Sequence, residues 1–153
     1  MTIVTKEEAD VAAFLKFIRF AEHHNDSDDV YFLLYGGKQR FLDTSKHPNQ
    51  RVKAWGKEST AAGAYQILYP TWYEAWKKGI VTDFSKASQD KLAIEKLRSR
   101  HALGYVQQGD IDHAIPLLRN EWTSLPGASQ SKMTMDGART PFAKYLSEVT
   151  GKP

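Results

Sequence analysis

The chain has 153 residues and a mass of 17.3 kDa, with 41% hydrophobic and 25% charged residues, which fits a single domain over 1–153 and excludes a disordered chain or a coiled coil. It has 21 Lys and Arg against 18 Asp and Glu, and the resulting net charge of +3 is too small to predict a nucleic-acid partner. The absence of cysteine excludes disulfides, thiolate catalysis and zinc–thiolate sites, and no apolar run approaches the ~18 residues of a membrane span.

The first predicted element is a helix that begins after Thr5. Thr5 and Glu8 have the spacing of a capping box, in which each side chain binds the backbone N–H of the other residue. Phe14 and Ile18 follow at helical spacing within one apolar face. The polar segment 23–29 predicts the loop that ends this helix.

A β-hairpin is predicted next. Residues 30–35 and 38–42 are two β-prone runs, and the glycine pair between them suits a tight turn. Segment 43–60 is polar and predicts a loop, and segment 61–66 predicts either a third short strand or a turn.

Helices are predicted over most of the remaining chain. Pro70 suits the first turn of a helix that stops at Gly79. Ser85 suits the N-cap of a longer helix that runs to about Arg100. Gly104 lies just beyond this helix.

Two more helices complete the predicted fold. Asp112 is preferred to Asp110 as the N-cap of the first, because Pro116 is tolerated best near a first turn. Thr140-Pro141 predicts the start of the last helix, and Gly151 its end. The fold class is therefore α+β, mostly helical with a small antiparallel sheet near the N-terminus.

Glu22 is the residue that points most directly to chemistry. It lies four residues after Ile18 and eight after Phe14, so it continues the apolar face of the first helix. Desolvation and the negative end of the helix dipole both favour the protonated acid and predict a raised pKa. A carboxylic acid that stays protonated near neutral pH can protonate a glycosidic oxygen. The alternative interpretation is a solvated residue at a frayed helix end.

An ordinary glycosidase uses a second carboxylate. Asp43 and Glu58 are the candidates here, but neither spacing places the side chain near Glu22. Each alone is better explained as a solvated loop residue, but a hydrolytic mechanism in which one of them assists a water stays open.

Loop aromatics and neutral polar side chains form a combination that suits sugar rings. Flat aromatic faces with a polar edge stack on sugars, although they also occur beside ordinary cores. The residues of this kind are Trp55, Tyr65, Tyr69, Tyr105, Gln66, Ser59 and Thr60.

The sequence predicts no cofactor and no metal site. The five histidines lack H-E-x-x-H spacing, and cysteine ligands are absent. The phosphate-binding and serine-hydrolase motifs G-x-x-x-x-G-K-[ST], G-x-G-x-x-G and G-x-S-x-G are absent as well.

Several separated segments resemble the bacteriophage lambda-type endolysins. The longest is Ser59-Thr60-Ala61-Ala62-Gly63-Ala64-Tyr65-Gln66-Ile67-Leu68, which Trp72 follows closely. The others are 83–85 with 88–90, 100–103, 109–111 and 122–128, together with Gly36-Gly37, Asp43 and His47-Pro48. Because these segments keep their order over nearly the whole chain, the resemblance is far more specific than any one motif.

The resemblance implies a lysozyme-like fold and a lytic transglycosylase that cleaves peptidoglycan for host-cell lysis. In that family one glutamate at the end of the first helix does the acid–base work, and Glu22 matches it. It would protonate the β-1,4 oxygen between N-acetylmuramic acid and N-acetylglucosamine, after which the muramic C6 hydroxyl closes a 1,6-anhydro ring without a second carboxylate. The candidate substrate contacts are Ser59, Thr60, Tyr65, Gln66, Asp43, Trp55 and Tyr105.

The family also closes its cleft with two mobile loops, which by position are about 52–62 and about 126–139 here. Both segments are rich in small and polar residues. The sequence departs from the lambda pattern in the shorter connection 23–35, where Phe32 replaces a carboxylate, and again at 130–135. Contacts with the sugar at the rim are therefore expected to differ.

The first ten residues are rich in charge and do not resemble a signal peptide. The resemblance implies synthesis in the host cytoplasm, release through a membrane-permeabilising holin, and action on peptidoglycan in the periplasm or cell wall. A monomer without stable membrane association is expected. The rival interpretations are a hydrolytic muramidase and a noncatalytic glycan-binding module.

Overall fold

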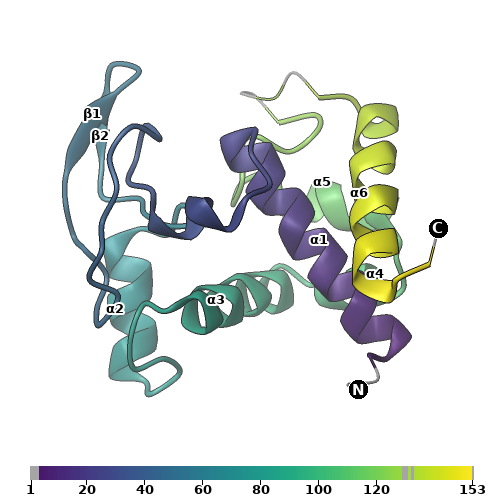
Figure 1. Cartoon of the computed structure of the whole chain (residues 1–153), viewed down its shortest axis with the longest axis horizontal. Coiled ribbons are helices and arrows are strands. Elements are labelled where there is room, and N and C mark those ends of the chain that lie inside the picture. Colours follow the sequence, from purple (N-terminus) through teal and green to yellow (C-terminus); the bar gives the residue numbers. More distant parts are fainter. Residues whose placement is uncertain (1–3, 129–130, 132, 153) are drawn as a thin grey trace. The chain divides into compact units, whose positions relative to one another are not determined.

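The structure is a computed structural model that describes residues 4–128, 131 and 133–152. In chain order its elements are α1 (Lys6–His23), the 3-10 helix η1 (Asp28–Phe32), β1 (Val52–Ala54), β2 (Lys57–Ser59), α2 (Tyr69–Lys77), α3 (Lys86–Ser99), α4 (Leu103–Gln107), α5 (Ile111–Leu118) and α6 (Met135–Thr150) (Figure 1). The predicted α+β class, mostly helical with one small antiparallel sheet, is confirmed. None of the described helices has the length and apolar character needed to cross a membrane.

The chain divides into two compact units. The first contains the described residues of 1–22 and 94–153, and the second contains 23–93. One boundary falls between Glu22 and His23, at the end of α1, and the other falls inside α3. The first unit is therefore built from both ends of the chain, and the second from one continuous segment.

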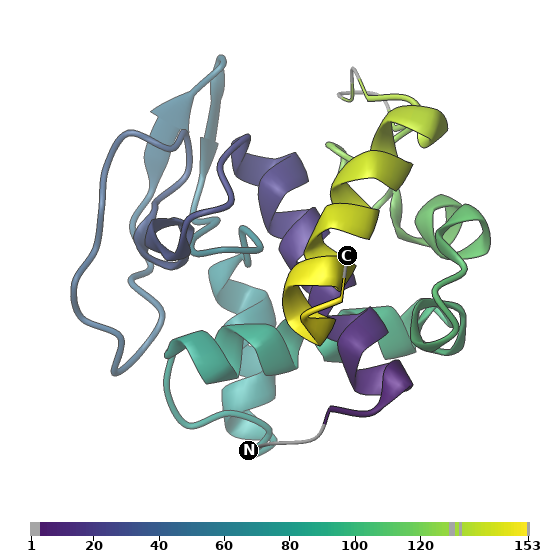
Figure 2. The ribbon, with the colours of Figure 1, turned by 45° about the vertical axis from the view of Figure 1, so that its right-hand side comes forward.

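The core of the first unit lies between α1 and α6, which run alongside one another in both ribbon views (Figures 1 and 2). Phe14 of α1 lies 5.9 Å from Phe17 and meets the ring of Phe142 in α6 edge-on at 6.4 Å, both between ring centroids. This confirms the apolar face predicted for the first helix. Other buried residues of this unit are Ile18, Leu97, Val106, Ile115, Leu118, Trp122, Leu125 and Tyr145.

The ends of α1 and α6 follow from hydrogen bonds of their caps. The capping box is present, since Thr5 Oγ1 accepts the N–H of Glu8 at 3.1 Å and Glu8 Oε2 accepts the N–H of Thr5 at 3.3 Å. The predicted start of the last helix at Thr140-Pro141 is wrong. Thr134 Oγ1 accepts the N–H of Gly137 at 2.9 Å, so α6 begins at Met135 and includes the proline.

Two further features of this unit differ from expectation. Gly104 lies just beyond α3, as predicted, but it belongs to the short helix α4, which the sequence does not predict. Asp110, not Asp112, is the N-cap of α5, because its Oδ1 accepts the N–H of His113 at 3.2 Å. The side chain of Asp112 is instead exposed and pairs with Arg139 at 2.5 Å.

In the second unit, the hairpin predicted over 30–42 forms only next to its turn. Residues 28–32 form η1, because Ser27 Oγ accepts the N–H of Asp29 at 3.0 Å and caps this short helix. The glycine turn does form, but the chain on either side of it makes only one isolated bridge, Leu33 to Arg40, in the described part of this hairpin. Val30, Tyr31 and Leu34 of the β-prone run are buried, and Leu34 also forms a bridge with Ala62.

The two-stranded sheet lies in the segment that the sequence predicts as a polar loop. β1 and β2 pair antiparallel, with Lys53 opposite Glu58. Trp55 and Gly56 form the turn with φ values of +51° and +73°, and such a two-residue hairpin turn requires positive φ. Three-residue strands with mostly polar side chains carry too little alternation to be recognised from sequence.

A buried glutamine holds the turn at 61–66, where the sequence allowed either a strand or a turn. Gln89 Oε1 accepts the N–H of Ala64 at 2.9 Å, and its amide donates to the carbonyls of Tyr31 and Phe84 at 3.1 Å each. Gly63 has a φ of +83°, and a Cβ there would overlap Gln89 Oε1. Only glycine fits this close approach.

The predicted starts of α2 and α3 are confirmed. Pro70 lies in the first turn of α2, and Gly79 follows the C-cap of that helix with a φ of +74°. Ser85 Oγ accepts the N–H of Ser88 at 3.2 Å at the start of α3.

Candidate active site

Glu22 lies in the last turn of α1 with its carboxylate largely shielded from solvent. The hydroxyl of Ser124 donates to Glu22 Oε1 at 2.6 Å. Burial raises the pKa of Glu22 above its ordinary value, and the Ser124 hydrogen bond opposes this shift without cancelling it. The raised pKa predicted from helix position is thus present, with desolvation as its main cause.

The segment that carries Ser124 is fixed by its neighbours. Trp122 and Leu125 are buried, with exposed fractions of 2% and 0%, so the backbone on both sides of Ser124 is anchored in the core of the first unit. Arg119 Nε donates to the carbonyl of Pro126 at 2.7 Å and closes the segment into a loop. The buried neighbours of Ser124 therefore hold its hydroxyl in position against Glu22.

Glu121 ties the same loop to α3. Its carboxylate accepts from Lys96 Nζ at 2.5 Å and from Arg100 Nε at 2.9 Å. Burial alone would raise the pKa of Glu121, but the two cations outweigh it and hold the pKa below its ordinary value. Glu121 is thus an ionised anchor and not a proton donor at neutral pH.

The residue after Glu22 is anchored in the second unit. His23 Nε2 lies 3.1 Å from the carbonyl oxygens of both Gly63 and Ala64, so this nitrogen carries the proton and donates. Burial lowers the pKa of His23 despite these bonds, which favour the charged form. The neutral ring thus holds His23 against the 63–64 turn of its own unit.

The two carboxylates considered as partners of Glu22 are both solvent-exposed in the second unit. Asp43 accepts from the hydroxyl of Ser45 at 2.6 Å and from its N–H at 2.9 Å, and these bonds lower its pKa. Glu58 is exposed on β2. Within the described residues, no group of three or more His, Asp or Glu side chains could hold a metal ion.

Four candidate substrate contacts lie along one short stretch of the second unit, and several of their polar groups have protein partners. Ser59 Oγ accepts the N–H of Ala61 at 3.0 Å, and Thr60 Oγ1 accepts the N–H of Tyr69 at 3.1 Å. Gln66 has a φ of +51° and its amide donates to the Gly63 carbonyl at 3.1 Å.

Tyr65 is the fourth of these residues, and its ring lies in the core. Its exposed fraction is 1%, and its hydroxyl donates to Asp90 Oδ1 at 2.5 Å. Tyr31 donates to the same oxygen at 2.7 Å. In this structure Tyr65 therefore holds the turn that carries Gln66.

Trp55 has the opposite environment. It lies at the tip of the β1–β2 turn with 78% of its surface exposed, and its ring meets Tyr35 edge-on with centroids 5.4 Å apart. A large exposed indole at a turn is a suitable contact for a flat ligand.

Tyr105 is remote from Glu22 within the first unit. It lies on α4 and stacks on His113 at 5.2 Å. Gly109, one turn later, lies close to Asp10, since a Cβ there would be 3.3 Å from Asp10 Oδ1. Asp10 and Glu22 are twelve residues apart on α1, or roughly 18 Å at 1.5 Å per residue. The structure does not bring Tyr105 beside Glu22.

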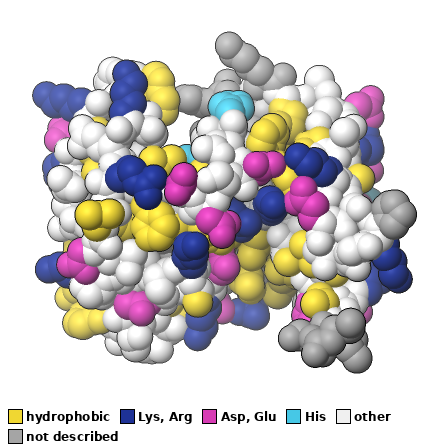
Figure 3. All heavy atoms as spheres, in the orientation of Figure 1, with side chains coloured by type: hydrophobic (Ala, Val, Ile, Leu, Met, Phe, Trp, Pro, Cys, Tyr) yellow, Lys and Arg dark blue, Asp and Glu magenta, His cyan; other side chains and the backbone are white. Residues whose placement is uncertain are grey.

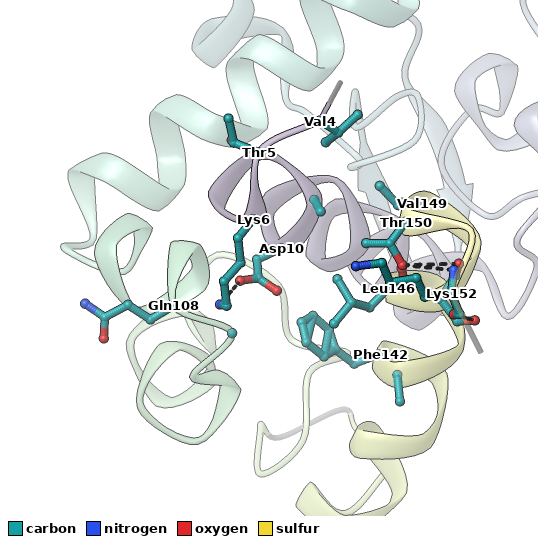
Figure 4. A pocket seen from close by; sticks show the side chains of 14 residues that line it. Val4, Thr5, Lys6, Asp10, Gln108, Phe142, Leu146, Val149, Thr150 and Lys152 are labelled. Carbon is teal, nitrogen blue, oxygen red and sulfur yellow. Dashed lines mark hydrogen bonds and ion pairs between the residues drawn. The ribbon is translucent and has the colours of Figure 1, made fainter. Parts of the chain in front are cut away.

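A large pocket of the first unit also lies at the start of α1, away from Glu22. It has a volume of about 960 Å³ and is lined mainly by apolar atoms of α1 and α6, among them Phe142 and Leu146 (Figure 4). The charged side chains Lys6 and Asp10 in it pair with each other at 2.7 Å. It holds no acid comparable to Glu22.

Sequence reasoning missed Ser124, Gln89 and Asp90 as parts of the site and its support. All three lie within the segments that carry the resemblance, but nothing in their spacing shows that they reach residues 25 to 102 positions away. The second predicted mobile loop, 126–139, includes residues 129, 130 and 132, which lie outside the described residues.

The chain is similar in sequence to a known family and to two phage proteins. The family model described as Endolysin matches residues 12–149. The chain is 39% identical to the endolysin of Escherichia phage P2 over 139 residues, covering 82% of this chain and 84% of the relative. It is 42% identical to the endolysin of Escherichia phage lambda over 123 residues, covering 76% and 77%.

Solved structures give the same result. The lysozyme of bacteriophage lambda in complex with a chitohexasaccharide superposes with a TM-score of 0.78 and 32% identity, covering 99% of both chains. A second structure of the lambda lysozyme also has a TM-score of 0.78, with 30% identity and 99% coverage of both chains.

Proposed function

The chain belongs to the endolysin family, and from that premise we propose that it cleaves peptidoglycan by lytic transglycosylation, as one lysozyme-like catalytic domain over 1–153. Peptidoglycan cleavage for lysis follows from the family and from the lambda lysozyme fold. Our proposal further specifies which bond is cleaved and which product forms. The bond is the β-1,4 link between N-acetylmuramic acid and N-acetylglucosamine, and the product carries a 1,6-anhydro ring.

The observation that carries the proposal is the environment of Glu22. Its raised pKa keeps the acid protonated at higher pH than a solvated glutamate, as a general acid requires. The Ser124 hydroxyl at 2.6 Å supplies a hydrogen bond that strengthens as the carboxylate forms. Glu121 is held ionised by Lys96 and Arg100 and is not a second acid.

The reaction uses the two protonation states of one side chain in turn. Glu22 donates its proton to the glycosidic oxygen, and the bond from that oxygen to muramic C1 breaks. The Glu22 carboxylate then takes the proton of the muramic C6 hydroxyl while O6 bonds to C1. The acid is restored, the anhydro ring is closed, and no water is consumed.

The sugar contacts are assigned to the second unit. Ser59, Thr60, Gln66, Asp43 and Trp55 offer polar or aromatic groups there, with Tyr65 holding the turn behind Gln66. A chitohexasaccharide is bound by the lambda lysozyme, and this supports a β-1,4-linked amino-sugar chain as ligand. Release from the cytoplasm by a holin and a monomeric state complete the proposal.

Product analysis tests the mechanism. Purified sacculi are digested with the protein in water enriched in ¹⁸O, and the soluble muropeptides are measured by mass spectrometry. We expect anhydromuramic ends without ¹⁸O. Reducing ends that carry ¹⁸O would instead establish a hydrolytic muramidase, and the absence of soluble products would indicate a glycan-binding module.

A further inference from the structure

The positive charge of the chain is concentrated in one segment. Residues 35–60 contain six Lys and Arg and two acidic residues, a net charge of +4, whereas the whole chain has a net charge of +3. This segment includes the β1–β2 hairpin, and Lys and Arg side chains are visible over that part of the surface in Figure 3. The basic residues are Lys38, Arg40, Lys46, Arg51, Lys53 and Lys57.

A pocket of about 230 Å³ opens within this segment, between the glycine turn and the hairpin. Gly36 lies against β1 so closely that a Cβ on it would be 3.0 Å from Ala54 Cβ. The rings of Tyr35 and Trp55 meet edge-on at 5.4 Å and form an aromatic corner of the pocket. Lys38 and Lys53 also line it, and we call it the Lys38–Lys53 pocket.

The two lysines of this pocket are not neutralised by the protein. Both are exposed, and neither is within ion-pair distance of an acidic side chain in the described part of the chain. Lys53 faces Glu58 across the sheet without pairing with it. By contrast, Arg40 nearby pairs with Asp29 at 3.6 Å. Lys38 and Lys53 would attract an anionic ligand, and the adjacent Tyr35 and Trp55 rings would favour one that also has a flat or apolar surface.

We propose that the Lys38–Lys53 pocket binds carboxylates of the peptide stems of peptidoglycan. This inference rests on the proposed function, since it assigns a second part of the same substrate. The sugars of the glycan chain carry no charge where the stems are attached, so they offer no anionic group for the two lysines to bind. The stems carry free carboxylates, and a strand held by its sugars presents them at high local concentration.

Binding by the inactive full-length chain tests the inference. In the Glu22→Gln background, affinity is measured for purified sacculi and for stem-free glycan, which is prepared with an amidase and then amidated at the lactyl carboxylate that the amidase leaves on each muramic acid. We expect the intact sacculi to bind about three- to tenfold more tightly at low salt, as two exposed ion pairs allow, with the difference lost at high salt. The double change Lys38→Gln and Lys53→Gln should remove the difference and leave binding to bare glycan unchanged.

A matched variant controls for net charge. Lys78→Gln with Lys91→Gln removes two exposed lysines outside segment 35–60 and should keep the preference for intact sacculi. A soluble muramyl tripeptide should also change the fluorescence of the exposed Trp55, and the Trp55→Phe variant should lose that signal.

Three outcomes would overturn the inference. One is equal affinity for intact and stem-free glycan. Another is a preference for intact sacculi that survives loss of both pocket lysines. The third is lysine-dependent binding to phosphatidylglycerol vesicles without stem dependence, which would identify a membrane contact. None of these outcomes contradicts the proposed function, which fails only if the wild-type protein releases no anhydro products.

Discussion

The hydroxyl of Ser124 donates to Oε1 of Glu22 at 2.6 Å, across 102 positions of sequence. This bond favours the ionised acid, whereas burial favours the protonated one, and burial prevails. Replacement of Ser124 by alanine should therefore raise the pKa of Glu22 further and move the alkaline limb of the pH–activity profile to higher pH. The peak rate should fall about tenfold, since the hydrogen bond to the developing carboxylate is lost.

Ser124→Thr is the control for this prediction, because it keeps a hydroxyl at the same atom. It should restore the position of the alkaline limb. A slower Ser124→Ala enzyme with an unmoved limb would show that Ser124 only supports the loop.

Replacement of Glu22 by glutamine should abolish lysis while the fold persists. The proton that glutamine cannot donate is expected to cost about 10²- to 10⁴-fold in rate. Thermal unfolding should remain unchanged or move to higher temperature, because a neutral amide replaces a desolvated acid. Turbidity loss of sacculi and calorimetry measure the two effects, and retention of near-normal lysis would exclude Glu22 as the acid.

Gly63→Ala should destabilise the protein strongly. The new Cβ would overlap Gln89 Oε1 and would break the amide network that holds the turn. A loss of at least about 3 kcal/mol in the free energy of unfolding is expected from the lost bonds and the positive φ together. Gly37→Ala is the matched control: it has a φ of +73° with nothing within 4 Å, so about 1–2 kcal/mol is expected. Equal losses in urea titrations would contradict the role of Gln89.

The stability of the fold should decrease as the pH falls below the ordinary histidine range. His47 is buried, its Nε2 donates to the Ile67 carbonyl at 2.7 Å, and its Nδ1 accepts the N–H of Asn49 at 2.9 Å, so the ring is neutral. Burial lowers the pKa of His47, as it does that of His23.

The sign of the pH effect follows from these lowered pKa values. Below the ordinary histidine pKa of 6.5 the unfolded chain takes up the protons first, so stability is lost on acidification, by up to about 1.4 kcal/mol per pH unit for each ring. His47→Gln and His23→Gln should each flatten the dependence of the melting temperature on pH between about 7 and about 5, and the double variant should flatten it most. A slope that neither change affects would refute this origin.

Elements with strong local signals were predicted correctly from the sequence. The capping box of α1, the proline at the start of α2 and the serine at the start of α3 depend on residues within one helical turn, so their spacing is enough to identify them. The position of Glu22 on an apolar helix face belongs to the same class, because helical periodicity is local.

Features that depend on residues far apart in the sequence could not be predicted in this way. Val30, Tyr31 and Leu34 are apolar or aromatic residues that lie in the core of the second unit, and the same composition also fits a strand. The start of α6 is set by the N-cap at Thr134, and Pro141 lies inside the helix, so Thr140-Pro141 does not mark the helix start that its composition predicts. Ser124 reaches Glu22 only through the tertiary fold, and no pattern within one helix or loop reveals it.

The division of the chain into one continuous and one discontinuous unit has a consequence for biosynthesis. Residues 23–93 emerge from the ribosome together, whereas Glu22 and Ser124 are separated by 102 positions, or about 5–20 s of translation. Until Ser124 is made, the nascent chain holds the glutamate without its hydroxyl partner and without α6 of its own unit. A chain that terminates before Ser124 therefore carries the complete second unit and the glutamate but not the hydroxyl that contacts it, and we expect it to be inactive.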